Sequence, residues 1–209
     1  MIRNIIFDLA GVLLNLNLER DTEALLSVGL PDFEGCIADR EIHGPISRYL
    51  YGLSEKDEFL KEIRPFCFPE ATDEEILASM DAVLDDIPPS RLAALVELRK
   101  YYKVYLLSNL YDTAWDYTQE LIQKGGYSVE QCFDEAFISY QLQLAKPNPL
   151  IYQKVFEATG IQPEETIYFD DSQDNIEAAK RFDVVSCLVP MNGIETCKEY
   201  QLLLETCSR

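Results

Sequence analysis

The sequence predicts an α/β protein, namely a doubly wound parallel sheet with a helical insert between the first strand and the rest of the chain. Short apolar runs typical of buried parallel strands recur along the chain, and amphipathic helical stretches separate the later runs. Such alternation of strand and helix favours a parallel sheet covered by helices. One long stretch interrupts the alternation and contains no convincing strand.

The expected elements follow from these patterns. Strands are predicted at 4–8, 103–107, 135–138, 166–170 and 184–189. Helical patterns within the interrupting stretch lie at 19–26, 33–41, 55–63 and 73–84. We therefore expect a core of residues 1–15 and 89–209, with a helical cap at residues 16–88. Pro88-Pro89 marks the return to the core, and Ser90 is expected to cap the helix that follows.

The composition is that of an acidic globular protein. The 209 residues carry a formal net charge of −19, and hydrophobic residues make up 47%. A surface of this sign repels nucleic acid and anionic membranes, so we expect neither as a partner. The chain shows no signal-peptide pattern, and its six cysteines match no zinc-binding spacing. We therefore expect a cytoplasmic protein with reduced thiols.

Polar residues at the ends of the predicted strands are the candidates for a site, because open parallel sheets bind ligands at this edge. Asp8 follows the first strand, where it could attack phosphorus, bind a metal or simply cap a turn. Ser108 and Asn109 follow the second strand. They could donate hydrogen bonds to phosphate oxygens or cap a helix predicted at 112–123.

A lysine and two adjacent acids complete the set. Lys146 precedes Pro147, which stiffens the loop, and Asn148 is expected to cap the next helix. An ammonium there could neutralise phosphate and carboxylate charge or lie on a solvated surface. Asp170 and Asp171 end an apolar strand, where their carboxylates repel each other unless a cation lies between them. Oxygen ligands alone favour Mg²⁺ over zinc.

The order of these residues resembles a known family. They occur along the chain as Asp8, Ser108-Asn109, Lys146-Pro147 and Asp170-Asp171. This order is similar to the four motifs of the haloacid dehalogenase (HAD) superfamily, and the likeness covers nearly the whole chain, including an insert that resembles the small helical cap. Bacterial phosphatases acting on hexose phosphates look most similar, with Phe-Asp-Leu at the start. The resemblance implies a Rossmann-like doubly wound core.

The resemblance also implies a mechanism and a cofactor. Asp8 would attack the phosphorus of a small phosphorylated metabolite, with a sugar phosphate as the candidate, and form an aspartyl-phosphate that water hydrolyses. Ser108 and Asn109 would hold the phosphoryl oxygens, and Lys146 would offset their charge. Mg²⁺ would be bound directly by Asp8, the carbonyl of Ala10 and Asp171, and through water by Asp170.

One position departs from the family pattern. Most phosphatases of this superfamily carry an acid two residues after the nucleophile, where this chain has Ala10. Alanine cannot protonate a leaving group, and such general acid–base help contributes on the order of 10²–10⁴ in rate. A substrate with a good leaving group, such as a glycosyl phosphate, would need that acid least.

Two other functions remain open from the sequence. Phosphonoacetaldehyde hydrolases also carry alanine there and use a cap lysine, for which Lys56 and Lys61 are candidates, although acidic neighbours favour a solvated helix surface. A catalytically impaired protein that binds phospho-ligands is the second alternative. His43, beside Gly44-Pro45, is interpreted as a loop residue, and Trp115 as a packing residue. The sequence does not predict an oligomeric state.

Overall fold

The computed structural model describes residues 1–207 and contains one parallel sheet. Its strands are β1 (Asn4–Phe7), β2 (Lys103–Ser108), β3 (Glu135–Ile138), β4 (Thr166–Asp170) and β5 (Val185–Leu188). They lie in the order β3-β2-β1-β4-β5, and every neighbouring pair is parallel. The predicted fold class and all five strand positions are confirmed.

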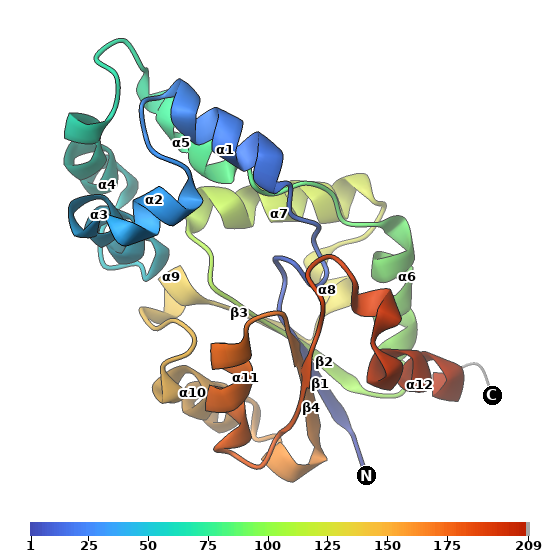
Figure 1. Cartoon of the computed structure of the whole chain (residues 1–209). Coiled ribbons are helices and arrows are strands. Elements are labelled where there is room, and N and C mark those ends of the chain that lie inside the picture. Colours follow the sequence, from blue (N-terminus) through green and yellow to red (C-terminus); the bar gives the residue numbers. More distant parts are fainter. Residues whose placement is uncertain (208–209) are drawn as a thin grey trace.

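Helices cover both faces of the sheet (Figure 1). On one face, Ile6 and Tyr105 pack with residues of α10 (Pro149–Thr159) and α11 (Gln173–Lys180). On the other face, Ile5 and Phe7 pack with residues of α6 (Pro89–Leu98) and α12 (Lys198–Cys207). Alternate strand residues therefore face opposite layers, as a strand period of two requires.

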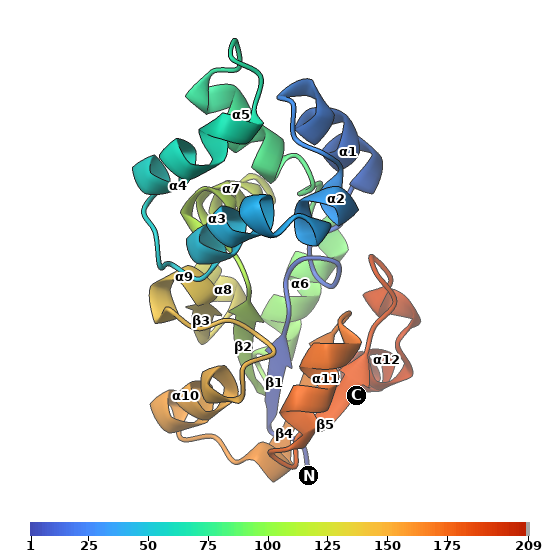
Figure 2. The same cartoon turned by 60° about the vertical axis from the view of Figure 1, so that its left-hand side comes forward.

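Five helices stand between β1 and α6 in the chain. They are α1 (Leu18–Ser27), α2 (Phe33–Ala38), α3 (Arg40–Leu50), α4 (Lys56–Ile63) and α5 (Asp73–Asp81), and a 3₁₀ turn (Arg64–Phe66) follows α4. We call residues 16–88 the helical insert. Figure 2 shows its helices gathered beyond one end of the strands. An antiparallel bridge between Leu16 and Leu84 joins its two connections to the sheet.

The insert shares its hydrophobic core with the sheet. Insert residues Ile42, Phe59 and Ile76 belong to the same buried cluster as Tyr111 and Trp115 near α7 (Asp112–Lys124). Trp115 is thus a packing residue, as the sequence analysis favoured. The remaining short elements are α8 (Val129–Cys132), α9 (Ser139–Leu142) and 3₁₀ turns at Pro163–Glu165 and Ile194–Thr196. Among residues 1–207, no helix combines the length and apolar character needed to cross a membrane.

The predictions inside the insert were partly wrong. The expected helix at 33–41 is interrupted at Asp39, whose extended backbone ends α2 and whose carboxylate accepts a hydrogen bond from Glu41 N at the start of α3. The helix α3 was missed because Gly44-Pro45 looks like a turn, and His43 consequently lies in a helix. Packing of the buried Ile42 and Tyr49 stabilises α3 despite its internal proline.

Ser90 was also assigned wrongly. The cap position of α6 lies two residues earlier, at Pro88, and Pro89 is the first residue of the helix. A proline suits that first position because its fixed φ is already helical and its missing N–H has no partner there anyway. The cap at Asn148 is confirmed, since its side chain accepts a hydrogen bond from Leu150 N at 3.0 Å.

Candidate active site

Asp8 lies at the carboxyl end of β1, in the middle of the sheet, and is 6% exposed. Its Oδ1 accepts hydrogen bonds from Leu9 N at 2.7 Å and Ser108 Oγ at 2.9 Å, and lies 2.8 Å from Lys146 Nζ. Within residues 1–207, all side-chain hydrogen bonds and ion pairs of Asp8 fall on Oδ1. The second oxygen, Oδ2, is therefore available to a ligand.

Lys146 is held between two carboxylates and is almost fully buried. Its Nζ lies 2.8 Å from Asp8 Oδ1 and 2.7 Å from Asp170 Oδ2. Burial alone would lower the pKa of this ammonium, but the charges of Asp170 and Asp8 hold the pKa above its ordinary value. Lys146 is therefore a permanent positive charge at the strand ends.

Asn109 fixes the backbone of that lysine. Its Oδ1 accepts a hydrogen bond from Lys146 N and its Nδ2 donates one to Lys146 O, both at 2.9 Å. The helix α7 begins at Asp112, and its cap position is Tyr111, which makes no side-chain cap hydrogen bond, so Asn109 is not a helix cap. The sequence could not indicate this pairing, because it joins segments 37 residues apart.

Asp170 is fully buried and oriented by several donors. It accepts hydrogen bonds from Lys146 Nζ, the Tyr168 hydroxyl, Ser172 N and Asn175 Nδ2. Burial would raise the pKa of this carboxyl, but Lys146 and these donors hold the pKa below its ordinary value. Asp170 is thus ionised and fixed in place. Tyr168 looks like an ordinary strand residue in the sequence, so its contact with Asp170 could not be predicted.

The negative charges of Asp8 and Asp171 are less fully balanced by nearby positive charges and hydrogen-bond donors. Burial raises the pKa of the Asp8 carboxyl to about 7, although the nearby ammonium of Lys146 lowers it and the charge of Asp170 adds to the increase. Burial and the charge of Asp170 also raise the pKa of Asp171, which is half-buried. Three carboxylates thus share one ammonium, and the excess negative charge favours a bound cation.

The geometry fits a divalent cation bound by oxygen atoms. One carboxylate oxygen from each of Asp8, Asp170 and Asp171 lies within 4.8 Å of the other two. Carboxylate oxygens without thiol or imidazole ligands are the donor set of Mg²⁺. Gly11 keeps this space open: its φ is +77°, and a Cβ there would lie 2.2 Å from Asp171 Oδ2. The residues present therefore fit Mg²⁺.

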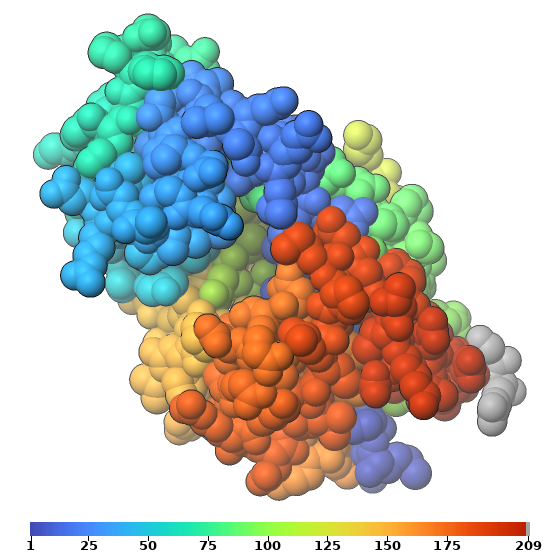
Figure 3. Space-filling model, in the orientation of Figure 1, coloured from blue at the N-terminus to red at the C-terminus, as the bar shows by residue number. Residues whose placement is uncertain are grey.

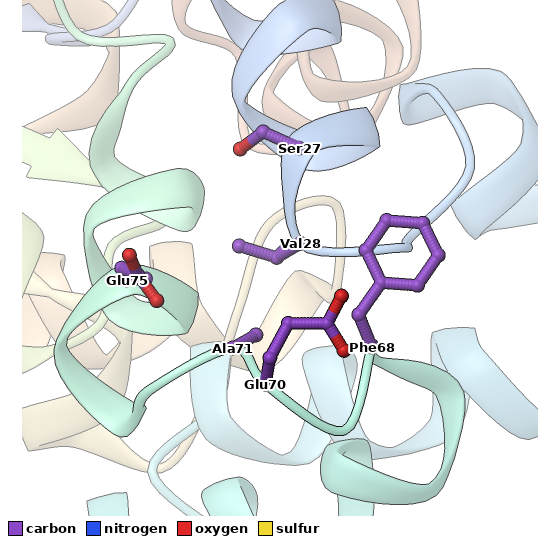
Figure 4. Close-up of a pocket in the computed structure, with 6 residues that line it drawn as sticks. All are labelled: Ser27, Val28, Phe68, Glu70, Ala71 and Glu75. Carbon is purple, nitrogen blue, oxygen red and sulfur yellow. The ribbon is translucent and has the colours of Figure 1, made fainter.

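The surface is hollowed between the insert and the core. Figure 3 shows a recess between the blue atoms of the insert and the orange atoms of the segment around α11. A separate cavity of about 250 Å³ lies within the insert, between the end of α1 and the chain before α5 (Figure 4). This cavity is separate from the charged cluster formed by Asp8, Lys146, Asp170 and Asp171. Its lining residues are Ser27, Val28, Phe68, Glu70, Ala71 and Glu75.

A doubly wound core with charged side chains at the carboxyl edge of its sheet is the usual arrangement of a ligand-binding site in an α/β protein. The family model described as haloacid dehalogenase-like hydrolase matches residues 2–183. The chain therefore belongs to this family, which confirms the prediction of a HAD-superfamily hydrolase.

Relatives of similar length include a curated phosphatase. Over 208 residues, the chain is 29% identical to D-ribitol-5-phosphate phosphatase from Bacteroides thetaiotaomicron, covering 99% of this chain and 100% of the relative. A HAD-family enzyme from the same organism, solved in complex with magnesium and inorganic phosphate, superposes with a TM-score of 0.83. It is 33% identical, and the match covers 91% of this chain and 96% of that enzyme.

A more distant neighbour shows the fold alone. The L-2-haloacid dehalogenase from Xanthobacter autotrophicus superposes with a TM-score of 0.58 at 19% identity. The match covers 90% of this chain and 78% of the dehalogenase. At this identity the likeness says nothing about substrate.

Proposed function

We propose that this protein is a Mg²⁺-dependent phosphatase that hydrolyses a small phosphorylated polyol or sugar through an aspartyl-phosphate on Asp8. The observation that carries the proposal is the unequal pairing of the Asp8 carboxylate. One oxygen is fixed by Ser108 and Lys146, and the other is left for a reacting group. A nucleophile held in this way attacks in a single orientation.

The reaction would proceed in two displacements. Asp8 Oδ2 attacks phosphorus, the phosphorus–oxygen bond to the substrate breaks, and the departing oxygen takes a proton from water. Water then attacks phosphorus, the bond between phosphorus and Asp8 Oδ2 breaks, and inorganic phosphate leaves. The proton that this water loses neutralises the hydroxide formed in the first step. Lys146 offsets the negative charge that collects beside Asp8, and the Ser108 hydroxyl and Asn109 contact the phosphoryl oxygens.

The divalent cation would be bound by Asp8, the Ala10 carbonyl and Asp171, with Asp170 reaching it through water. When bound, Mg²⁺ supplies charge stabilisation to the phosphoryl group. The surroundings of Asp170 and Asp171 support these different roles in metal binding. Asp170 accepts hydrogen bonds from Lys146, Tyr168 and Asn175, whereas Asp171 is only half-buried.

The recess and the name of a similar enzyme support the proposed substrate class. We assign residues 1–15 and 89–209 to the catalytic core and residues 16–88 to a cap over the strand ends. A small ligand enclosed there would suit a phosphorylated polyol or sugar, and the similar Bacteroides enzyme carries the name of a ribitol phosphate phosphatase. Lys56 and Lys61, the candidates for a Schiff base, are both exposed on α4, which favours phosphatase chemistry over carbon–phosphorus cleavage.

A screen of phosphorylated polyols and sugars tests this proposal. Phosphate release should occur with Mg²⁺, stop with EDTA and return when excess Mg²⁺ is added. A wild-type protein that binds these compounds without turnover would instead support the phospho-ligand-binding alternative. A lysine trapped by borohydride in the presence of phosphonoacetaldehyde would support the carbon–phosphorus hydrolase.

A further inference from the structure

A polar network joins the turn after Asp8 to the loop that follows β5. Asn192 lies in that loop in the left-handed conformation, with a φ of +60°. Its N–H donates to Gly11 O at 2.6 Å. Its side chain accepts a hydrogen bond from Leu16 N at 2.8 Å and donates one to Leu16 O at 2.9 Å. One residue therefore holds both ends of the turn from Gly11 to Leu16.

Arg91, from the first turn of α6, holds the middle of the same turn. Its guanidinium donates to Leu13 O at 3.1 Å, Asn15 Oδ1 at 2.9 Å and Asn192 O at 3.0 Å. Two further hydrogen bonds reach the carboxylate of Glu195 at 2.6 and 3.0 Å. A guanidinium has five N–H donors, so these five bonds use all of them. The side chain is only 3% exposed.

The turn that this network holds forms one wall of the charged site. The N–H groups of Val12, Leu13 and Leu14 all donate to Leu9 O, which closes the turn tightly around Ala10. Gly11 lies against Asp171 Oδ2, so close that a Cβ would overlap it. A shift of the turn would consequently move the Ala10 carbonyl and change its distance to Asp171.

We propose that Asn192 and Arg91 are positioning residues that hold the Ala10 carbonyl and Asp171 at the separation a divalent cation requires. This inference rests on the proposed function, because it concerns the metal site of the same reaction. Neither residue touches the reacting atoms. They act through the turn, as outer partners of metal ligands do, and losing such partners typically weakens metal binding about 10–100-fold.

The variant Asn192→Gly isolates the side chain. Glycine accepts the left-handed backbone without strain, so only the two bonds to Leu16 are removed. Calorimetry without substrate should show Mg²⁺ binding weakened about tenfold. Hydrogen exchange should become faster at the amide of Leu16. The matched control is Asp183→Gly, since Asp183 has a φ of +61° in the loop between α11 and β5. The control should leave both measurements unchanged.

Measuring kcat at several Mg²⁺ concentrations distinguishes a role of Asn192 in positioning the metal site from a role in overall stability. In Asn192→Gly, kcat should recover at saturating Mg²⁺, because only the affinity for the ion is lowered. An affinity for Mg²⁺ within twofold of wild type, with only the melting temperature reduced, would overturn the proposal. If the wild type binds Mg²⁺ but hydrolyses no phosphate ester, the proposed function fails, and the calorimetric comparison still decides the role of Asn192.

Discussion

Lys146 illustrates how a single residue sets the electrostatics of the site. Its ammonium lies within 2.8 Å of carboxylate oxygens from two strands, in a region that solvent barely reaches. Low solvent access strengthens these interactions and makes an unpaired charge costly. Removing the ammonium should therefore affect both the reaction and the ionisation of Asp8.

The variant Lys146→Met tests this role. It keeps much of the aliphatic stem and removes the charge. We expect kcat to fall by about 10²–10³, the usual effect of losing one electrostatic contact to a transition state. Loss of the ammonium should also raise the pKa of Asp8 further, so the acid limb of the pH–rate profile should move to higher pH. Steady-state kinetics between pH 5 and 9 would measure both, and an unshifted profile would contradict the assignment.

Ala10 carries a second prediction at the residue scale. Without a proton donor at this position, the rate should depend strongly on the leaving group. The variant Ala10→Asp should accelerate alkyl phosphates by about 10²-fold while changing aryl phosphates little, because good leaving groups need no acid. Wild-type turnover of alkyl and aryl phosphates at similar kcat would count against this reasoning.

At the scale of elements, the contact between the helical insert and the core includes the acidic residues Asp81 and Asp112. Thr113 Oγ1 donates to Asp81 Oδ1 at 3.2 Å, and the Tyr111 hydroxyl donates to Met80 O at 2.6 Å. The Tyr49 hydroxyl donates to Asp112. Burial raises the pKa of Asp81 from 3.8 to about 6, with the charge of Asp112 contributing in the same direction. Asp81 therefore joins the end of α5 to the start of α7, and its ionisation can be followed by varying the pH.

The variant Asp81→Asn should reveal the sign of this effect. Because the folded-state pKa lies above the ordinary value, the folded protein binds the proton more tightly, and stability is lost as pH rises through about 6. Asparagine carries no charge at any pH. The melting temperature of the variant relative to wild type should therefore increase between pH 5 and pH 7.5. A difference that is constant across this range would show that Asp81 is not perturbed.

A further prediction at this scale concerns the anchoring of α6. Replacing Arg91 with methionine removes the donor to the buried carbonyl oxygen of Leu13 and to the partly buried carbonyl oxygen of Asn192. The free energy of unfolding should fall by about 1–3 kcal/mol, the cost of an unsatisfied buried polar group. The matched control is Arg3→Met, whose ion pair with Glu165 is exposed and should contribute less than about 1 kcal/mol. Urea denaturation of the two variants would compare these costs directly.

At the scale of the whole molecule, the sheet could be predicted because each strand is indicated by its own short stretch of sequence. Buried parallel strands appear as short apolar runs, and the acids and hydroxyl at their ends are brought together by the sheet itself. The helix α3 was not predictable, because its stability comes from packing of Ile42 and Tyr49 rather than from its own sequence, which contains Gly44-Pro45. Tertiary contacts override local propensity in such segments.

The contacts that orient the site were the other part that the sequence concealed. Asn109 pairs with the backbone of Lys146, and Asn192 pairs with that of Leu16, across separations of 37 and 176 residues. Arg91 looks like an ordinary helix residue until its acceptors are seen. A motif shows which side chains lie at the strand ends, whereas the residues that hold them in place are found only in three dimensions.

The most direct measurement is a search for the covalent intermediate. Turnover of a phosphorylated polyol or sugar is quenched in acid, and mass spectrometry locates the phosphoryl group. We expect it on the peptide that contains Asp8, only when Mg²⁺ is present, and not in Asp8→Asn. Phosphate release without an adduct on Asp8, or an unchanged rate in Asp8→Asn, would contradict the account.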